Sequence, residues 1–479
     1  MTGRFSWTDG NVRSALGLSQ VDSVPENLTS NADGIFHFDR VSTDSRTASD
    51  GDLFVALKGE NFDGHDYVNA AFENGARGAI VSQKVKVVDH SRIYSVNDTL
   101  YALGQLAAYR RTHLRATVVG ITGSSGKTGT KDLMRAALSG FCRPHATTGN
   151  FNNRIGLPLT LLDVPEDTEV VIVEMGTNQP GEIGILADIA VPEIGVVTTV
   201  SETHIEKLDS LEGVLREKLD LLRGLTEDGR AVVGDDPLIL SKEARKINPQ
   251  TKVVGWSKQA DSAFQPNEAT MDKHGNWSFL WHGEPVHLRI PGRHSVVNAL
   301  LALAVADMLD VPAATAASGV SSLETSPMRC EIRNIGELTL LLDCYNANPQ
   351  STRAALKLLA DIEPERPKIA FLGDMLELGV RSEELHTTIL IDAANMGFDI
   401  IVGTGYFTVA IDQVEYPSTG TEIISIADPI EAYNVLRDHL NGDEVILFKA
   451  SRGFALERVI PEFERDFGNT MTAPEEVGY

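Results

Sequence analysis

Short runs of aliphatic and β-branched residues alternate along the chain with longer stretches whose apolar positions recur every three or four residues. Thr117–Ile121, Val170–Val173 and Ile194–Val200 are runs of this kind. Continuous apolarity of this length predicts strands that are buried on both faces, as in a parallel sheet. Helix-period stretches follow these runs. This alternation predicts an α/β domain whose ligands bind at the carboxyl ends of the strands.

The same alternation extends over the rest of the chain and predicts three domains. Residues 257–290 break the pattern, because their polar and aromatic runs indicate a β-rich insertion. Further strands are predicted at 338–342, 369–372, 400–403 and 445–448. We therefore expect an N-terminal α/β domain, a central P-loop domain with a parallel sheet, and a C-terminal Rossmann-like domain, at residues 1–112, 113–324 and 325–479.

A glycine-rich turn at residues 123–126 separates the first of these strands from a helix that ends near Gly140. A strand, a glycine turn and a helix N-terminus together present backbone N–H groups to an anion. Lys127 adds a charge for the β- and γ-phosphates, and the Thr128 hydroxyl can hold Mg²⁺. Ile121 stands where the usual P-loop has its first glycine. The strand and helix context nevertheless favours a nucleotide site over a structural turn, and we expect ATP.

Two polar residues follow neighbouring strands of the predicted central sheet. Glu174 ends one strand and His204 follows the next, so both are expected at the ligand-binding edge. A carboxylate beside a P-loop suits a metal ion. A capping or solvated glutamate is equally compatible with this position, and a lone histidine is more often structural.

Lys218 lies on the apolar stripe of a helix that Asp209 or Ser210 caps. It is three and four residues from Leu215 and Val214, so it faces inward. An inward lysine is costly unless it is paired or chemically modified.

Two further groups of polar residues have competing interpretations. Asp44-Ser45-Arg46 reads as a solvated loop or as a hydroxyl and guanidinium that bind a phosphorylated ligand. His294 and Asn298, at the start of an Ala- and Leu-rich helix, are either caps or contacts to a base, and caps are commoner.

Composition and charge narrow the function classes. The chain has 479 residues, 42% of them hydrophobic, and a formal net charge of −25. This charge argues against nucleic acid or an anionic membrane as a main partner. Three cysteines without C-x-x-C spacing indicate neither a zinc site nor a disulfide framework. No segment resembles a signal peptide or a membrane span, so we expect a cytoplasmic protein.

Taken together, the motifs resemble those of the Mur ligases, ATP-dependent amide-forming enzymes of peptidoglycan synthesis. The resemblance covers nearly the whole chain, from about Val41 to Gly453. Its most specific pieces are Thr122–Thr128, Asn152–Pro158, Glu174–Asn178, Tyr345–Pro349 and Gly373–Gly379.

The resemblance implies roles for individual residues. Lys218 matches the lysine that the family carbamoylates, and Asn298 matches its adenine-proximal asparagine. The expected catalytic residues are Lys127, Lys218, His204 and Glu174, and the expected metal ligands are Thr128, Glu174, His204 and carbamoylated Lys218. The expected nucleotide contacts are Gly123, Ser124, Ser125, Gly126, Lys127, Thr128, Asn298, Arg329 and Asp343. The expected substrate contacts are Ser45, Arg46, Asn152, Asn153, Tyr345, Asn346, Lys449, Ser451 and Arg452.

The chain departs from the family pattern at four positions. Ser295, Thr199 and Val233 stand where the family usually has asparagine, and Ala450 stands for glycine. None of these departures touches the four expected catalytic residues. They bear instead on the nucleotide contacts.

By the same resemblance, ATP with Mg²⁺ activates the terminal carboxylate of a UDP-N-acetylmuramoyl-tripeptide as an acyl phosphate. The amine of D-alanyl-D-alanine then attacks it, and the Asn-Pro signature at 345–349 points to this amine. We expect a monomer. The rival hypotheses are a folylpolyglutamate synthase with an acidic amine donor, a P-loop NTPase switch or motor, and a ligand-binding relative without catalysis.

Overall fold

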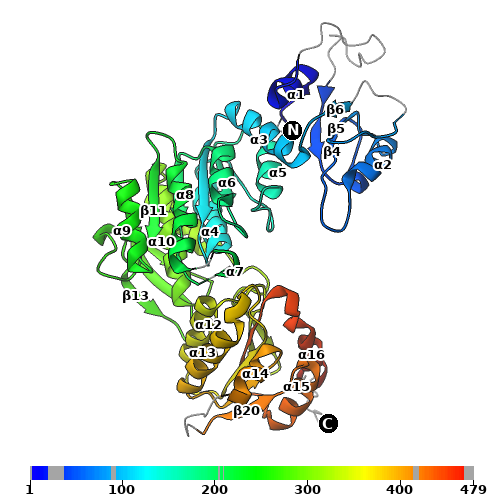
Figure 1. Cartoon of the computed structure of the whole chain (residues 1–479). Coiled ribbons are helices and arrows are strands. Elements are labelled where there is room, and N and C mark those ends of the chain that lie inside the picture. The colour runs from blue at the N-terminus through cyan, green and yellow to red at the C-terminus, as the bar shows by residue number, and fades with distance from the viewer. Residues whose placement is uncertain are drawn as a thin grey trace, which may run out of the picture.

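Three α/β domains follow one another along the chain in a computed structural model, which describes residues 3–19, 37–87, 93–202, 205–208, 210–413 and 420–468. Figure 1 shows the N-terminal domain, in blue, and the C-terminal domain, in orange and red, at opposite ends of the central domain. The architecture predicted from the alternation of strands and helices is confirmed.

The N-terminal domain is built on a parallel four-stranded sheet of order β3-β4-β5-β6. Its elements are β1 (Trp7–Thr8), α1 (Asp9–Leu16), β2 (His37–Phe38), β3 (Arg40–Ser42), β4 (Asp52–Val55), α2 (Val68–Glu73), β5 (Gly78–Val81), β6 (Ile93–Ser95) and α3 (Thr99–Thr112). Asp98 caps α3 by accepting hydrogen bonds from the backbone N–H groups of Leu100 and Tyr101. Helix α3 also packs on two helices of the central domain, α5 (Gly156–Leu162) and α6 (Glu182–Ala190), and so joins the two domains.

The central domain contains a parallel six-stranded sheet of order β12-β11-β10-β7-β9-β8. Besides α5 and α6, its elements are β7 (Thr117–Thr122), α4 (Lys127–Ser139), β8 (Pro144–Ala146), β9 (Val170–Glu174), β10 (Ile194–Val197), α7 (Ile205–Leu208), α8 (Leu211–Arg223), β11 (Arg230–Gly234), α9 (Leu238–Ile247), β12 (Lys252–Val254), β13 (Asn267–Met271), β14 (Trp277–Trp281), β15 (Glu284–His287), α10 (Arg293–Met308) and α11 (Ala313–Ser322). Strands β13, β14 and β15 form a separate antiparallel sheet, which is the predicted β-rich insertion.

Side chains alternate along β7 between two cores. Val119 and Ile121 pack with helices α4, α10 and α11, whereas Val118 packs with helices α5, α6 and α8. Both faces of the sheet are therefore covered, which explains the continuous apolar runs in the sequence. Because β7 lies between β10 and β9, the turn that follows it opens at the centre of the sheet edge.

The C-terminal domain has a six-stranded sheet of order β16-β17-β21-β18-β19-β20. Its elements are β16 (Glu331–Ile335), β17 (Leu338–Asp343), α12 (Pro349–Asp361), β18 (Lys368–Leu372), α13 (Ser382–Asn395), β19 (Ile400–Gly403), α14 (Tyr406–Gln413), β20 (Glu422–Ser425), α15 (Pro429–Leu436), β21 (Val445–Lys449) and α16 (Ile460–Phe467). The four predicted strands are present. Neither of the two edge strands, β16 and β20, was predicted, because exposed edges carry polar residues that interrupt the apolar runs.

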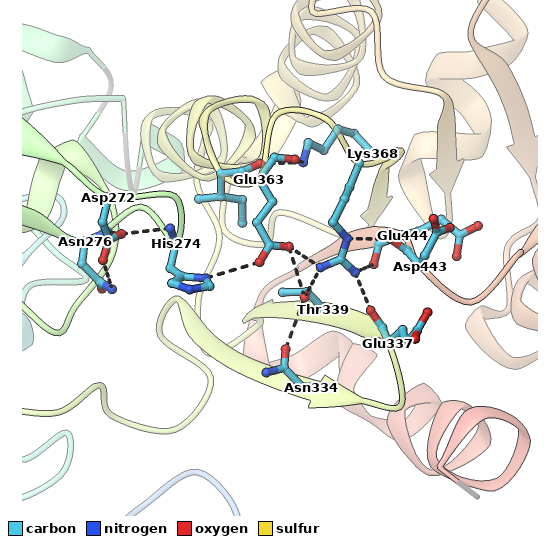
Figure 2. Close-up of polar contacts among 12 residues, drawn as sticks. Asp272, His274, Asn276, Asn334, Glu337, Thr339, Glu363, Lys368, Asp443 and Glu444 are labelled. Carbon is cyan, nitrogen blue, oxygen red and sulfur yellow. Dashed lines mark hydrogen bonds and ion pairs between the residues drawn. The ribbon is translucent and has the colours of Figure 1, made fainter. Parts of the chain in front are cut away.

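The turn between β13 and β14 joins the central domain to the C-terminal domain. His274 Nδ1 lies 3.3 Å from a carboxylate oxygen of Glu363, and the Glu363 N–H donates to the carbonyl oxygen of Lys273 at 2.8 Å. Figure 2 shows Glu363 between His274 and Thr339. A Cβ on Gly275, which has φ of +81°, would lie 2.6 Å from a methyl carbon of Leu358. The turn therefore needs glycine here to pack closely on α12.

Candidate active site

The glycine turn after β7 brings the backbone closer to its neighbours than any side chain would allow. A Cβ on Gly123 would lie 1.9 Å from Thr198 Oγ1, and one on Gly126 would lie 2.6 Å from Asn298 Oδ1. Both glycines have positive φ, +146° and +82°. No side chain of the described residues caps α4, so its first N–H groups are available to an anion. The Lys127 ammonium donates to the Gly123 carbonyl oxygen at 2.7 Å.

Glu174 is buried at the end of β9, with 2% of its surface exposed. One carboxylate oxygen accepts a hydrogen bond from the Thr128 hydroxyl at 3.0 Å, and the other accepts one from the Asn152 amide at 2.9 Å. Its backbone N–H donates to the Thr147 hydroxyl at 3.0 Å. These bonds hold the carboxylate against the first turn of α4, as expected for a group that acts beside a phosphate site.

Lys218 is 1% exposed on the inward face of α8, which confirms its predicted orientation. Burial, and then the positive charge of Lys127, lowers the pKa of Lys218 to about 7. The adjacent Glu217 carboxylate is occupied by the N–H groups of Gly181 and Ile183, at 2.6 and 2.9 Å. Lys218 is therefore a buried amine that can be neutral near physiological pH.

A cleft of about 1270 Å³ lies between the central and C-terminal domains. Most of the expected site residues line it: Ser124, Ser125, Gly126, Lys127, Thr128, Asn152, Glu174, Asn298, Arg329, Asp343, Tyr345, Asn346 and Lys449. Apart from Gly123, the expected nucleotide contacts of the two domains thus face one cavity. Lys218 is buried and is not part of the lining.

The C-terminal domain contributes ordered charges to this cleft. The guanidinium of Arg329 lies 4.0 Å from the centre of the Tyr345 ring and donates to the Thr128 hydroxyl at 3.4 Å. The buried ammonium of Lys449 pairs with Asp343 at 2.8 Å and donates to the Asn346 carbonyl oxygen at 2.6 Å. The cation and the carboxylate hold each other in place at the ends of neighbouring strands β21 and β17.

Two residues at the start of α12 that were not among the expected site residues also reach the P-loop domain. Asn348 donates to the Ser125 hydroxyl at 3.1 Å, and Gln350 donates to the Thr199 hydroxyl at 3.0 Å. Asn348 is also the N-cap of α12, with Pro349 at the first helical position. An Asn-Pro pair before a helix-period stretch is a recognisable cap signal. It could have identified the helix start, although not the contact with Ser125.

Several expected substrate residues lie outside the cleft lining. Ser45 and Arg46 belong to the N-terminal domain, where the Arg46 side chain is 86% exposed and pairs with Asp44. Asn153 accepts hydrogen bonds from the N–H groups at the start of α5. Ser451 and Arg452 follow β21 and are likewise absent from the lining. His204 lies outside the residues that the structure describes.

Of the two interpretations of His294 and Asn298, the one in which they cap α10 is wrong. Within the described residues, the N-cap position is Gly292 and no side chain caps the helix. Asn298 instead lies against Gly126, and His294 Nε2 lies 3.8 Å from the sulfur of Cys330. The first turns of α10 therefore contribute to the lining of the cleft, through residues that include His294 and Asn298.

The structure shows what surrounds the four residues that depart from the family pattern. The Ser295 hydroxyl is buried and donates to the Pro291 carbonyl oxygen at 2.9 Å, so it satisfies the helix backbone. The Thr199 hydroxyl donates to the carbonyl oxygen of Asp236 and accepts from Gln350. Val233 and Ala450 are buried apolar residues.

A metal ion would have few protein ligands here. Among the described residues, no three His, Cys, Asp or Glu side chains converge as a metal site requires. One buried carboxylate and one hydroxyl beside a phosphate site nevertheless suit Mg²⁺, which is commonly held by one or two carboxylates together with substrate phosphates. Within the same described ranges, none of the helices combines the length and apolarity that crossing a bilayer needs.

Comparisons with known proteins agree with this arrangement of domains and site residues. The profile of the Mur ligase middle domain matches residues 121–306, that of the Mur ligase glutamate ligase domain matches 328–452, and that of the Mur ligase family catalytic domain matches 37–111. A UDP-N-acetylmuramoyl-tripeptide–D-alanyl-D-alanine ligase from Bacillus subtilis (strain 168) is 36% identical over 88% of this chain and 92% of its own length. The chain belongs to the Mur ligase family.

Solved structures point to one branch of the family. A crystal structure of MurF from Acinetobacter baumannii is 28% identical, covers 96% of this chain and 99% of its own, and has a TM-score of 0.85. MurF ligase from Thermotoga maritima in complex with ADP is 29% identical, covers 89% of this chain and 97% of its own, and has a TM-score of 0.78. The ADP complex and the family membership support ATP as the nucleotide that this chain uses.

Proposed function

We propose that this chain joins D-alanyl-D-alanine to a UDP-N-acetylmuramoyl-tripeptide at the expense of ATP. The observation that carries the proposal is the convergence of Lys127, Thr128 and Glu174 at one end of a cleft whose opposite wall comes from the C-terminal domain. Curated relatives and solved structures that match nearly the whole chain bear the name of this ligase.

The first step is phosphorylation of the terminal carboxylate of the tripeptide. A carboxylate resists attack by an amine, because its leaving group would be an oxide. Transfer of the γ-phosphoryl group from ATP makes an acyl phosphate, whose leaving group is phosphate. Lys127 and the uncapped N-terminus of α4 offset the charge on the transferred group. Arg329, which reaches Thr128 from the C-terminal domain, adds a second cation.

Lys218 is suited to carbamoylation. It is buried, and its lowered pKa leaves a neutral amine to react with CO₂. Carbamoylation replaces the buried ammonium group of Lys218 with a negatively charged carbamate. We infer that Thr128, Glu174, His204 and carbamoylated Lys218 hold Mg²⁺, which when bound supplies charge neutralisation to the phosphates.

The second step is attack of the dipeptide amine on the acyl phosphate. Tyr345, Asn346 and Lys449 lie on the C-terminal wall of the cleft and are assigned to this substrate side. Asn298, Arg329 and Asp343 are assigned to the nucleotide. Ser45 and Arg46 are assigned to the uridine nucleotide in the N-terminal domain. Closure of the cleft excludes water, which would otherwise hydrolyse the acyl phosphate.

The test is product formation with purified protein, MgATP and UDP-N-acetylmuramoyl-tripeptides that end in lysine or in diaminopimelate. D-Alanyl-D-alanine should give a product heavier by the dipeptide residue, detected by mass spectrometry. Glutamate in place of the dipeptide should give none. A product with glutamate alone would instead support an enzyme of the folylpolyglutamate type.

A further inference from the structure

The strand pairing that leads to Glu174 is interrupted at its last step. Strand β8 runs parallel to β9, and the N–H of Thr147, directly after β8, donates to the Ile172 carbonyl oxygen at 2.9 Å. In a regular parallel ladder, the next bond would run from the Glu174 N–H to the Thr147 carbonyl oxygen. The Glu174 N–H donates instead to the Thr147 hydroxyl, at 3.0 Å. The Thr147 carbonyl oxygen is thereby left to another donor.

That donor is Lys131, on the second turn of α4. Its ammonium group donates to the Thr147 carbonyl oxygen at 2.8 Å and lies 3.2 Å from a carboxylate oxygen of Asp132. Only 4% of Lys131 and 2% of Thr147 are exposed. Burying an ammonium group is costly, and these charge-assisted contacts offset only part of the cost. An apolar residue would pack at this inward position without that cost, so the lysine points to a task for its donor.

These bonds close a ring that begins and ends on α4. The Thr128 hydroxyl donates to one carboxylate oxygen of Glu174 at 3.0 Å. The Glu174 N–H donates to Thr147, whose carbonyl oxygen accepts from Lys131. Because Thr128 and Lys131 are three residues apart, they lie on the same face of the helix. The carboxylate and the main chain of Glu174 are thus both tied to the helix whose first turn forms the candidate phosphate site.

The segment that begins at Thr147 also holds the other oxygen of the Glu174 carboxylate. The Asn152 amide donates to this oxygen at 2.9 Å, and the Asn152 carbonyl oxygen accepts from the Gly176 N–H at 2.7 Å. A Cβ on Gly176 would lie 2.9 Å from the Asn152 side chain, so the segment packs closely on the chain after β9. A shift of the Thr147 main chain would therefore disturb both groups that hold Glu174 from this side.

We propose that Lys131 is a positioning residue for phosphoryl transfer, which acts through Thr147 to fix Glu174 against the phosphate-binding turn. This inference rests on the proposed function, in which Thr128 and Glu174 hold Mg²⁺. Without the Lys131 donor, the Thr147 carbonyl oxygen would turn to the Glu174 N–H and complete the parallel ladder. The protein would still fold, but Glu174 would leave its present position relative to Thr128.

The experiment breaks the ring at two different bonds. Lys131→Met removes the ammonium donor, and Thr147→Val removes the hydroxyl that accepts from Glu174. Two substitutions serve as matched controls. Thr147→Ser keeps the hydroxyl, and Asp132→Asn removes the ion-pair partner of Lys131 but leaves the bond to Thr147. Steady-state kinetics of ligation and calorimetric titration of ADP, with and without Mg²⁺, are measured for each variant and for the double variant Lys131→Met/Thr147→Val.

Lys131→Met and Thr147→Val should each lower kcat by about 10-fold or more, with KM for the UDP-linked tripeptide and for the dipeptide unchanged. The gain in ADP affinity on addition of Mg²⁺ should shrink by a similar factor, whereas ADP affinity without Mg²⁺ should equal that of the parent chain. The double variant should lose no more than the worse single variant, because both substitutions break the same ring. Thr147→Ser and Asp132→Asn should stay close to the parent chain in both measurements.

An unchanged gain from Mg²⁺ in Lys131→Met would overturn the inference, as would additive losses in the double variant. An equal loss of ADP affinity without Mg²⁺ would show that Lys131 supports the P-loop itself rather than Glu174. A Lys131→Met chain that does not fold would also contradict the inference, because the ladder bond should replace the lost one. Failure of the parent chain to form product would instead refute the proposed function, since the ADP titration needs neither of the other substrates.

Discussion

The side-chain amide of Asn348 donates a hydrogen bond to the hydroxyl of Ser125 at 3.1 Å. This bond links the N-terminus of α12, in the C-terminal domain, to the glycine turn of the central domain. The same asparagine caps α12, because its side-chain oxygen accepts from the N–H of Ser351 at 2.8 Å. Asn348 thus caps α12 through its side-chain oxygen and contacts the P-loop through its side-chain nitrogen.

The two tasks of Asn348 can be separated by substitution. Asn348→Asp keeps the cap but removes the amide donor, so stability should be retained while turnover falls. Asn348→Ala loses both and should also lower the free energy of unfolding by about 1 kcal/mol. Steady-state kinetics and urea unfolding of both variants provide the check. Parent-like turnover in Asn348→Asp would show that the bond to Ser125 has no part in the reaction.

Lys127→Ala should abolish turnover without unfolding the protein. The side chain donates to the Gly123 carbonyl oxygen and, in the proposed reaction, faces the phosphates. Lys246→Ala serves as the control, because Lys246 is exposed and pairs only locally with Glu243. Thermal unfolding should be similar for both variants and the parent. Retained activity in Lys127→Ala would exclude the P-loop assignment.

Lys218→Arg should inactivate the enzyme, because a guanidinium keeps its charge and cannot form a carbamate. In the parent chain, ¹³CO₂ should give a carbamate signal by ¹³C NMR that the variant lacks. Wild-type activity in the variant would remove the carbamate hypothesis, as would a parent chain that shows no carbamate signal while active.

Arg46→Ala should raise KM for the UDP-linked substrate far more than KM for ATP. Arg46 is exposed in the N-terminal domain and pairs with Asp44 rather than with the cleft. Arg77→Ala, which breaks a comparable pair with Asp50 in the same domain, should leave both constants unchanged. Equal effects of Arg46→Ala on the two substrates would count against the assignment of the uridine nucleotide to this domain.

Lys368 should make stability depend on pH. Its ammonium donates to the carbonyl oxygens of Ile362 and Glu363, near the junction in Figure 2, and burial lowers its pKa to about 8. Between pH 8 and its ordinary value near 10.5, only the unfolded chain holds the proton. The free energy of unfolding should therefore fall as the pH falls from 10.5 to 8, and Lys368 should add no slope below that.

Lys368→Met should reduce this slope, as measured by urea unfolding at several pH values between 8 and 10.5. A slope identical to that of the parent chain would mean that Lys368 keeps its ordinary pKa in the folded protein.

Much of the site could be predicted from the sequence, because many of its residues come directly after strands. Glu174 and the glycine turn come directly after apolar runs, and parallel strands bring their carboxyl ends to one edge of a sheet. Lys218 could be predicted from its phase on α8. Each of these inferences depends on residues close in sequence, so local pattern was sufficient.

The contacts between domains could not be predicted in the same way. Asn348 and Ser125 are more than two hundred residues apart, and their hydrogen bond depends on how two domains pack. The hydrogen bond from Gln350 to Thr199 likewise joins two domains. Hydrophobic periodicity carries no information about either.

The most direct test of the account is phosphate release from MgATP by the purified protein, with the UDP-linked tripeptide and D-alanyl-D-alanine omitted in turn. The proposed ligase requires both for sustained release, with one phosphate for each product molecule that is heavier by the dipeptide residue. Equal hydrolysis of ATP without either substrate would contradict the account and make the chain a P-loop NTPase.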